Sequence, residues 1–180
     1  MDVTGINWGS VADWASAFGS VSAAMVALYL AHTSQRVQLS VICGVRVIVG
    51  GGAAPVHLAS IMVTNTGDRQ FKISNISIQH GLIKKKYGVL KIGAPTEYCE
   101  SLLRVLNDGD QAHFGFPLES ETNWVATMGN DCLTELDIAT IRITIHCSNG
   151  QSVKIKPEKP LLDFIRTRMR KLQNNEANTL

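Results

Sequence analysis

Residues 14–31 read WASAFGSVSAAMVALYLA, and the polar residues His32-Thr33-Ser34-Gln35 follow them. No Asp, Glu, Lys or Arg occurs from Trp14 to Gln35, and 14 of the 18 residues in the quoted stretch are apolar. A helix rises about 1.5 Å per residue and needs roughly 20 such residues to cross about 30 Å of hydrocarbon. The stretch therefore predicts a transmembrane helix over residues 13–33, preceded by an N-terminal tail at residues 1–12.

Two other roles for this helix compete with the membrane interpretation. In a soluble oligomer it would be a packing seam, but surface helices of soluble proteins normally carry a charged face, and this one has none over six turns. A cleaved signal peptide is disfavoured because no Lys or Arg precedes Arg36, so a basic n-region is missing. We therefore favour the membrane anchor and keep the soluble oligomer as an alternative.

Two ridges on this helix are candidates for self-association. Larger side chains recur at alternating spacings of four and three, as in a coiled-coil seam: Trp14, Phe18, Val21, Met25 and Leu28. Small residues recur every four positions, which lets a second helix approach closely: Ala15, Gly19, Ala23, Ala27 and Ala31. Ala and Gly are also common in membrane helices that do not associate. We take the small ridge as the candidate helix-association site and expect a homo-oligomer.

The distribution of charge predicts an orientation. Residues 1–35 contain two acidic residues and no Lys or Arg, whereas residues 36–180 contain all 17 basic residues and the other 13 acidic ones, a difference of +4. Because basic flanks stay cytoplasmic, we predict the N-terminus outside and the domain inside at the cell (inner) membrane. A charge of +4 suits a domain near an anionic leaflet and is too small to argue for nucleic acid.

The rest of the chain is predicted to be mainly β. Frequent short apolar runs separated by turn residues indicate an antiparallel β-sandwich of about seven to nine strands over residues 36–158. Residues 36–49 predict two strands or one bent strand, which Gly50-Gly51-Gly52 ends. Residues 57–79 contain two apolar runs around a turn at Asn65–Asp68, which predicts a hairpin. Three more short strands are expected at residues 102–106, 111–118 and 121–128, after a loop at residues 93–101.

Residues 137–147 form the clearest strand, because Ile and polar residues alternate along it. The turn at residues 148–151 then sets the register with the next strand. A two-residue loop would place lysines on the buried face, since a slip of one residue reverses every side chain. We therefore predict a three-residue loop with Gly150 in a left-handed conformation, which pairs Ile145 with Ile155.

The helix, its polar hinge and the segment VTNTGDRQFKIS at Val63–Ser74 together resemble a group of small bacterial and prophage-encoded single-pass membrane proteins with a β-sandwich head. A turn at Leu106–Asp110 is similar to one that precedes a further strand in that group. The resemblance covers roughly residues 10–120 and implies a fold. Most members have no assigned function, so it implies no catalytic residue.

Basic residues gather in two places that are candidate membrane-surface sites. The first is Lys84, Lys85 and Lys86, where a solvated turn or a charged edge strand is the alternative. The second is a predicted amphipathic helix over residues 160–173, followed by a flexible tail at residues 174–180. That helix would either lie on an anionic membrane or pack on the sandwich as a cap. Its last turns carry the basic residues Arg166, Arg168, Arg170 and Lys171.

Catalytic and metal-binding patterns are missing from the sequence. The five histidines show no metal-ligand spacing. The four cysteines form no C-x-x-C pair, which fits a reducing compartment, and their spacing is equally compatible with two disulfides. Asn107–Asp110 has no Glu at the twelfth position of a calcium loop and predicts a turn instead. Neither a nucleophile elbow nor a phosphate-binding loop occurs. We expect no enzyme activity, no cofactor and no metal.

These observations together favour one function over two alternatives. We expect a membrane-anchored, non-enzymatic protein–protein interaction module with a cytoplasmic β-sandwich, whose partners are membrane lipid and an unknown protein. The first alternative is an oligomerising membrane-perturbing or pore-forming effector of the phage-defence or toxin type. The second is the soluble oligomer that uses the N-terminal helix as a packing seam.

Overall fold

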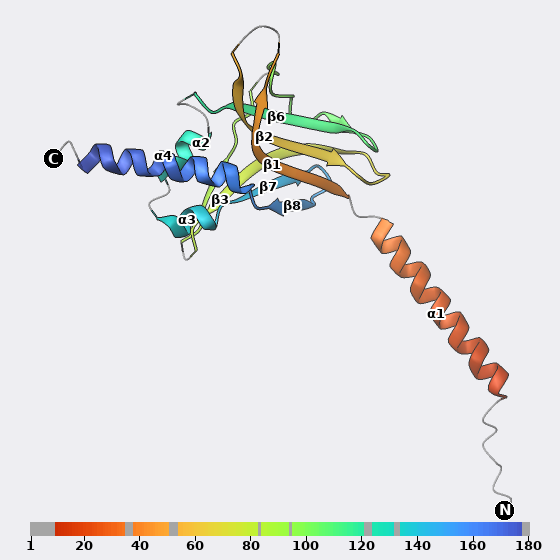
Figure 1. Cartoon of the computed structure of the whole chain (residues 1–180). Coiled ribbons are helices and arrows are strands. Elements are labelled where there is room, and N and C mark those ends of the chain that lie inside the picture. Colours follow the sequence, from red (N-terminus) through yellow and green to blue (C-terminus); the bar gives the residue numbers. More distant parts are fainter. Residues whose placement is uncertain are drawn as a thin grey trace, which may run out of the picture. The chain divides into compact units, whose positions relative to one another are not determined.

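A computed structural model describes residues 10–34, 38–50, 54–82, 84–93, 95–120, 124–131 and 134–177. The chain divides into two compact units, residues 1–36 and residues 37–180 (Figure 1). The described part of the first unit is one helix, α1 (Val11–Ser34). In the second unit, the described residues form eight strands and three helices.

Helix α1 confirms the predicted N-terminal apolar helix. A capping box fixes its start: the Asp13 backbone N–H donates to Ser10 Oγ (3.3 Å), and the Ser10 N–H donates to an Asp13 carboxylate oxygen (3.0 Å). Asp13 also places negative charge in the first turn, where the helix dipole favours it. The helix therefore begins two residues before the predicted boundary.

The first sheet has three antiparallel strands in the order β1 (Leu39–Ile48), β2 (Val56–Asn65) and β6 (Gln111–Pro117). Strand β1 runs without interruption, so this segment forms one strand and not the two strands of the other prediction. Ile61, at the centre of β2, pairs with Cys43 on one side and Phe114 on the other, and all three side chains are buried. The predicted glycine turn after β1 lies partly outside the described residues.

The second sheet is also antiparallel, and its order is β4-β3-β7-β8, with β5 paired to the beginning of β3. Its strands are β3 (Phe71–His80), β4 (Lys86–Val89), β5 (Val105–Leu106), β7 (Arg142–Cys147) and β8 (Ser152–Ile155). The two sheets contribute to one buried core, which confirms the predicted antiparallel β-rich fold.

The predicted hairpin between β2 and β3 is wrong, because the two strands lie in different sheets. Asn65, which is fully buried, turns the chain from one sheet to the other. Its side-chain amide donates to the carbonyls of Arg69 (2.9 Å) and Leu106 (3.1 Å), and its backbone N–H donates to the Asp110 carbonyl (2.9 Å). These hydrogen bonds satisfy the buried polar groups of Asn65 in a turn that connects the two sheets. Such a turn uses the same residue types as a hairpin turn, so the sequence alone does not distinguish them.

Cys147 and Gln151 close the loop between β7 and β8, because the Cys147 N–H donates to the Gln151 carbonyl (2.9 Å). Three residues lie between them, with Gly150 at a φ of 81°, as predicted. The predicted pairing is wrong by two positions, since Ile145 pairs with Val153 and not with Ile155. A shift of two positions leaves every side chain on its predicted face. Accordingly, Ile143 and Ile145 are both fully buried.

Two predicted strand segments are helical. Residues 124–128 of the strand predicted at residues 121–128 belong to helix α2 (Trp124–Asp131), and residues 121–123 lie outside the described part of the chain. Trp124, Val125 and Met128 are buried, which is the i, i+1, i+4 pattern of one helical face.

Helix α3 (Glu135–Ala139) occupies the beginning of the strand predicted at residues 137–147, so β7 starts only at Arg142. A capping box starts α3, in which Thr134 and Asp137 each accept a backbone N–H of the other. The predicted strand at residues 102–106 is likewise shorter, because only Val105 and Leu106 pair.

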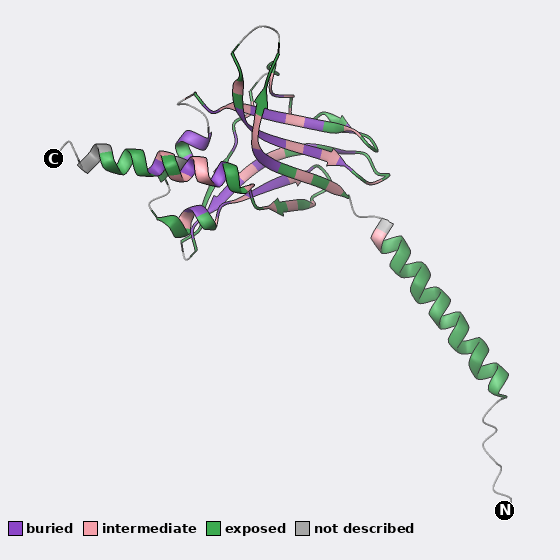
Figure 2. Ribbon diagram, viewed as in Figure 1, coloured by how far each residue is buried: buried purple, intermediate pink, exposed green. Residues whose placement is uncertain are grey.

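Helix α4 (Lys159–Ala177) packs its apolar face into the domain (Figure 2). Leu161, Leu162, Ile165 and Met169 are buried in the same core as the two sheets. Of the two alternatives for this helix, the structure has the cap. The helix also continues through residues 174–177, which were predicted to be flexible, and residues 178–180 lie outside the described part.

Candidate functional site

Helix α1 exposes its apolar side chains within its unit (Figure 2). Every residue from Val11 to His32 is exposed, including Trp14 at 65%, Phe18 at 79% and Leu28 at 73%. Residues 11–33 are long and apolar enough to cross a membrane, a property that signal sequences near an N-terminus share. A helix without a polar face requires an apolar environment around it. The observation behind the anchor candidate is therefore the exposed, apolar and uncharged surface of α1.

Both ridges of α1 are exposed. The small residues Ala15, Gly19, Ala23, Ala27 and Ala31 wind slowly around one side, because a spacing of four advances about 40° per step. The larger residues of the other ridge lie opposite the small residues near the middle of the helix. Within the described residues, a Cβ atom placed on Gly19 meets nothing within 4 Å. The small ridge therefore has the room that close helix packing requires.

The three consecutive lysines lie at the start of an edge strand. Lys84 and Lys85 precede β4, Lys86 is its first residue, and all three are exposed. Gly81 makes the preceding turn with a φ of 95°, and its N–H donates to Thr140 Oγ1 (3.0 Å). A charged edge of this kind discourages pairing with other sheets.

A cavity of about 430 Å³ lies beside these lysines. Lys84, Lys86, Asp131 and Asp137 all line it, so its charges are mixed. The buried His80 lines it too, and Nδ1 of this side chain has no hydrogen-bond partner within the described structure. Lysines and carboxylates side by side give no clear preference for an anion or a cation.

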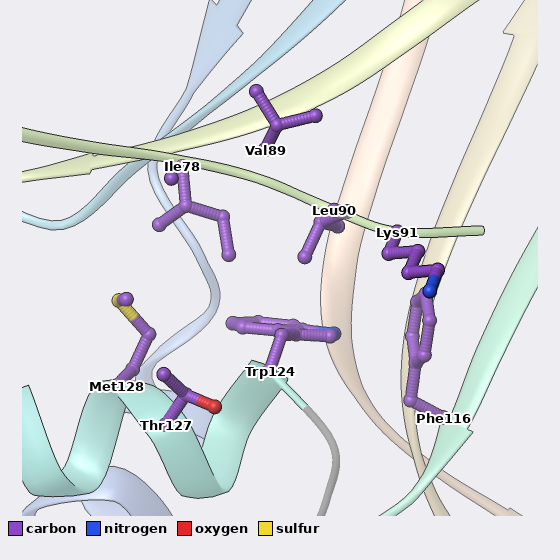
Figure 3. A pocket seen from close by; sticks show the side chains of 9 residues that line it. Ile78, Val89, Leu90, Lys91, Phe116, Trp124, Thr127 and Met128 are labelled. Carbon is purple, nitrogen blue, oxygen red and sulfur yellow. The ribbon is translucent and has the colours of Figure 1, made fainter.

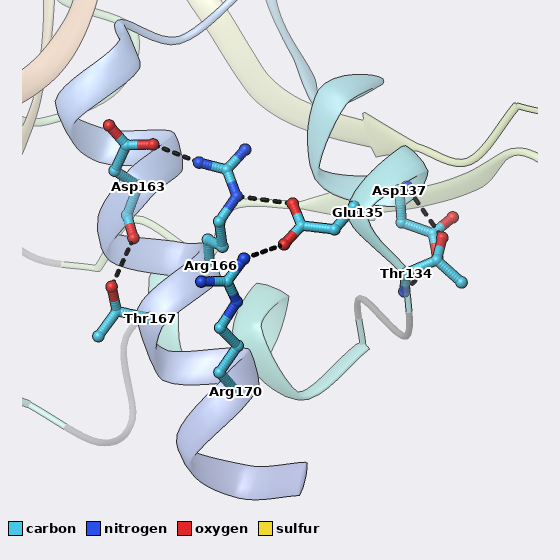
Figure 4. A network of polar contacts seen from close by, with 7 residues as sticks. All are labelled: Thr134, Glu135, Asp137, Asp163, Arg166, Thr167 and Arg170. Carbon is cyan, nitrogen blue, oxygen red and sulfur yellow. Dashed lines mark hydrogen bonds and ion pairs between the residues drawn. The ribbon is translucent and has the colours of Figure 1, made fainter.

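The basic residues of α4 separate into two groups. Arg166 and Arg170, one turn apart, both contact Glu135 of α3 (Figure 4). Arg166 Nε donates to Glu135 Oε2 (2.6 Å), Arg170 Nη2 donates to Oε1 (2.8 Å), and Asp163 also pairs with Arg166. Hydrogen bonds from Arg166 and then Arg170 lower the pKa of Glu135. These two arginines therefore join α4 to α3.

Arg168 and Lys171 lie on a different side of α4 and are not part of this cluster. Arg168 lines a mostly apolar cavity of about 590 Å³ together with Val45, His57 and Phe164. Lys171 is exposed. The four basic residues proposed as one membrane-facing set thus do not form one surface. Of these four, Arg168 and Lys171 have no ion pair with another described residue.

The described cysteines are buried and free: Cys43, Cys99 and Cys147. Burial, followed by the charge of Glu158, raises the pKa of Cys43 to about 12, so its thiol stays protonated and unreactive. Ser60 Oγ and His113 Nε2 lie 2.7 Å apart, but Ser60 is only 2% exposed and does not reach solvent. Among the described residues, no group of three or more His, Cys, Asp or Glu could hold a metal ion.

Sequence reasoning missed an apolar cavity of about 270 Å³ between β4 and helix α2 (Figure 3). Its lining includes Ile78, Gly88, Phe116, Trp124 and Met128. The available signal was Gly88, a residue without a side chain inside an otherwise alternating strand. The sequence could not show which groups surround that position, since they come from distant segments.

The chain matches no protein-family model, and no curated protein matches it either.

Proposed function

We propose that this chain is a single-pass membrane protein of the bacterial inner membrane, whose cytoplasmic β-sandwich binds another protein and has no catalytic activity. The exposed, uncharged surface of α1 carries the proposal, because water is an unfavourable environment for it. The charge difference on the two sides of α1 supports an external N-terminus.

The packed domain of residues 37–180, called the head below, supports a role separate from that of the anchor. Residues 37–180 form their own compact unit with their own core. A domain of this kind presents the same surface whichever apolar helix tethers it. Binding through the head therefore depends on attachment to the membrane and not on the sequence of α1.

Alkaline carbonate washing of membranes tests the anchor, by comparing the full chain with a version that starts at Arg36. We expect only the full chain to resist extraction. If both versions wash off, α1 is a packing element and the soluble oligomer replaces the anchor. A reporter fused after residue 180 that is active only in the cytoplasm tests the orientation, and an inactive reporter contradicts it.

Replacement of α1 by an unrelated transmembrane helix tests the interaction module. In living cells, a photo-crosslinking residue at the exposed Tyr87 of β4 should give the same adduct with either anchor. The same residue at Lys171 of α4 is the matched exposed control. An adduct that disappears with the new helix contradicts binding through the head.

The open small ridge supports a second candidate, an oligomerising membrane-perturbing effector. Gly19→Leu combined with Ala23→Leu fills the ridge, while Val21→Leu combined with Met25→Leu alters the opposite side as a control. For an effector, only the first pair should abolish toxicity and crosslinked oligomers. If toxicity and oligomers survive the first pair unchanged, the effector function is wrong.

A further inference from the structure

The cavity between β4 and α2 arises because Gly88 faces the core. Gly88 pairs with Ile78, and opposite residues of an antiparallel pair place their side chains on the same face. Ile78 is buried, so a side chain at residue 88 would point inward. A Cβ atom there meets nothing within 4 Å. The cavity therefore includes the space that a side chain at residue 88 would occupy.

The walls of this cavity are mostly apolar. Trp124 lies across it, with Leu90 and Met128 on either side, and Phe116 packs edge-to-face with Trp124 at 6.2 Å between ring centroids (Figure 3). Its volume is about 270 Å³. Liquid water occupies about 30 Å³ per molecule, so the cavity holds about nine non-hydrogen atoms.

The polar groups at the cavity favour a negative head group. Lys91 is exposed and is the one charged residue that lines the cavity among those described. Residues 81–93 contain four lysines and no Asp or Glu, so the segment that carries Lys91 is positively charged. Trp124 Nε1 is buried without a hydrogen-bond partner in the described structure, and the half-buried Phe116 packs against the same indole ring.

We propose that this cavity binds a straight-chain carboxylate of about eight to ten carbons, with the chain over Gly88 and the carboxylate at Lys91. A chain of this length matches the room for about nine non-hydrogen atoms in the cavity. The carboxylate provides the charge that Lys91 attracts and the acceptor that Trp124 Nε1 lacks. This site involves no residue of α1, so it is independent of the proposed anchor.

Methyl NMR of the full chain in lipid nanodiscs, with ¹³C-methyl methionine, tests the site. Octanoate should shift the signal of Met128, which lines the cavity, saturably and leave that of Met169, buried in α4, unchanged. Hexanoate should bind about 15-fold more weakly, since each buried methylene contributes about fourfold. Met25 of α1 reports partition of the fatty acid into the bilayer and separates that effect from binding.

Gly88→Ile places four carbons in the space over residue 88 that the ligand chain would occupy, and should abolish the Met128 response. The Tm should stay equal or rise, because a β-branched side chain suits a strand. Lys91→Gln should remove the preference for octanoate over 1-octanol, whereas Lys85→Gln, outside the cavity, should keep it. The proposal is overturned if octanoate leaves Met128 unshifted in the wild type. An equal Met128 shift in folded Gly88→Ile overturns it as well.

Discussion

A single arginine in the middle of α1 tests the membrane anchor most directly. Ala24 is nine residues from Thr33 and thirteen from Val11, so it lies about 14 Å and about 20 Å from the two ends of the span. It belongs to neither ridge, so helix association is not the first property that Ala24→Arg changes. Thr33→Arg places the same charge at the helix end, where it can reach the interface, and serves as the control.

The expected effect of Ala24→Arg follows from the free energy by which the wild-type helix favours membrane insertion. An arginine at the helix centre costs about 2.5–3.5 kcal/mol, which reduces the inserted fraction relative to the uninserted one about 60- to 300-fold. The Phe, Val and Leu residues of the quoted stretch together contribute only about 1.5–3 kcal/mol in favour of insertion, and three serines reduce that. One charge is therefore enough to reverse the balance.

Carbonate extraction provides the readout for both variants. We expect the wild type and Thr33→Arg to remain in the membrane pellet and Ala24→Arg to move to the supernatant. A carbonate-soluble wild type refutes the anchor outright. Equal retention of Ala24→Arg and Thr33→Arg refutes the inference that residue 24 lies in hydrocarbon.

Three further predictions concern the head. Ile165→Ala should lower the free energy of unfolding by about 2–5 kcal/mol in chemical denaturation, since Ile165 is fully buried; a helix that only rests on a membrane surface would lose almost nothing. Gly44→Ala should cost at most about 1 kcal/mol, because its Cβ displaces the carboxylate of Glu158 from a half-exposed pair with Arg46; in a Glu158→Ala background the cost should disappear. Glu135→Gln should lower the Tm at pH 7. Because the fold lowers the pKa of Glu135, its contribution is present above the unfolded pKa of about 4.3 and should be lost as the pH falls through the folded value; a Tm difference that persists in strong acid contradicts this.

The sequence predicted the elements whose patterns are long or repeat with one clear period. Helix α1 was found from an uncharged run, and the buried side of β7 was found from the alternation of Ile143 and Ile145. The left-handed Gly150 followed from turn chemistry, which is local. The apolar side of α4 was also correct, although the surface that covers it could not be chosen from its sequence.

Short apolar runs and long-range partners were not predictable in the same way. The run at Trp124–Met128 fits a strand or a helix equally well, because five residues do not define a period. The turn at Asn65 suits both a hairpin and a crossing between sheets, and its distant partner Leu106 decides between them. The Gly88 cavity is a property of packing, so no local pattern contains it.

The order of strands in the two sheets has a consequence for synthesis at the ribosome. Ile61 of β2 can pair with Phe114 only after 53 further residues have been synthesised. Ile76 of β3 can pair with Ile145 only after 69 further residues. Such distant pairing makes folding slow. At about 5–20 residues per second, α1 is complete roughly 6–23 s before β7 ends. Helix α1 is therefore complete while residues 37–180 are still being synthesised. If α1 is the anchor proposed above, it can insert first, and residues 37–180 then fold with their N-terminal end already tethered.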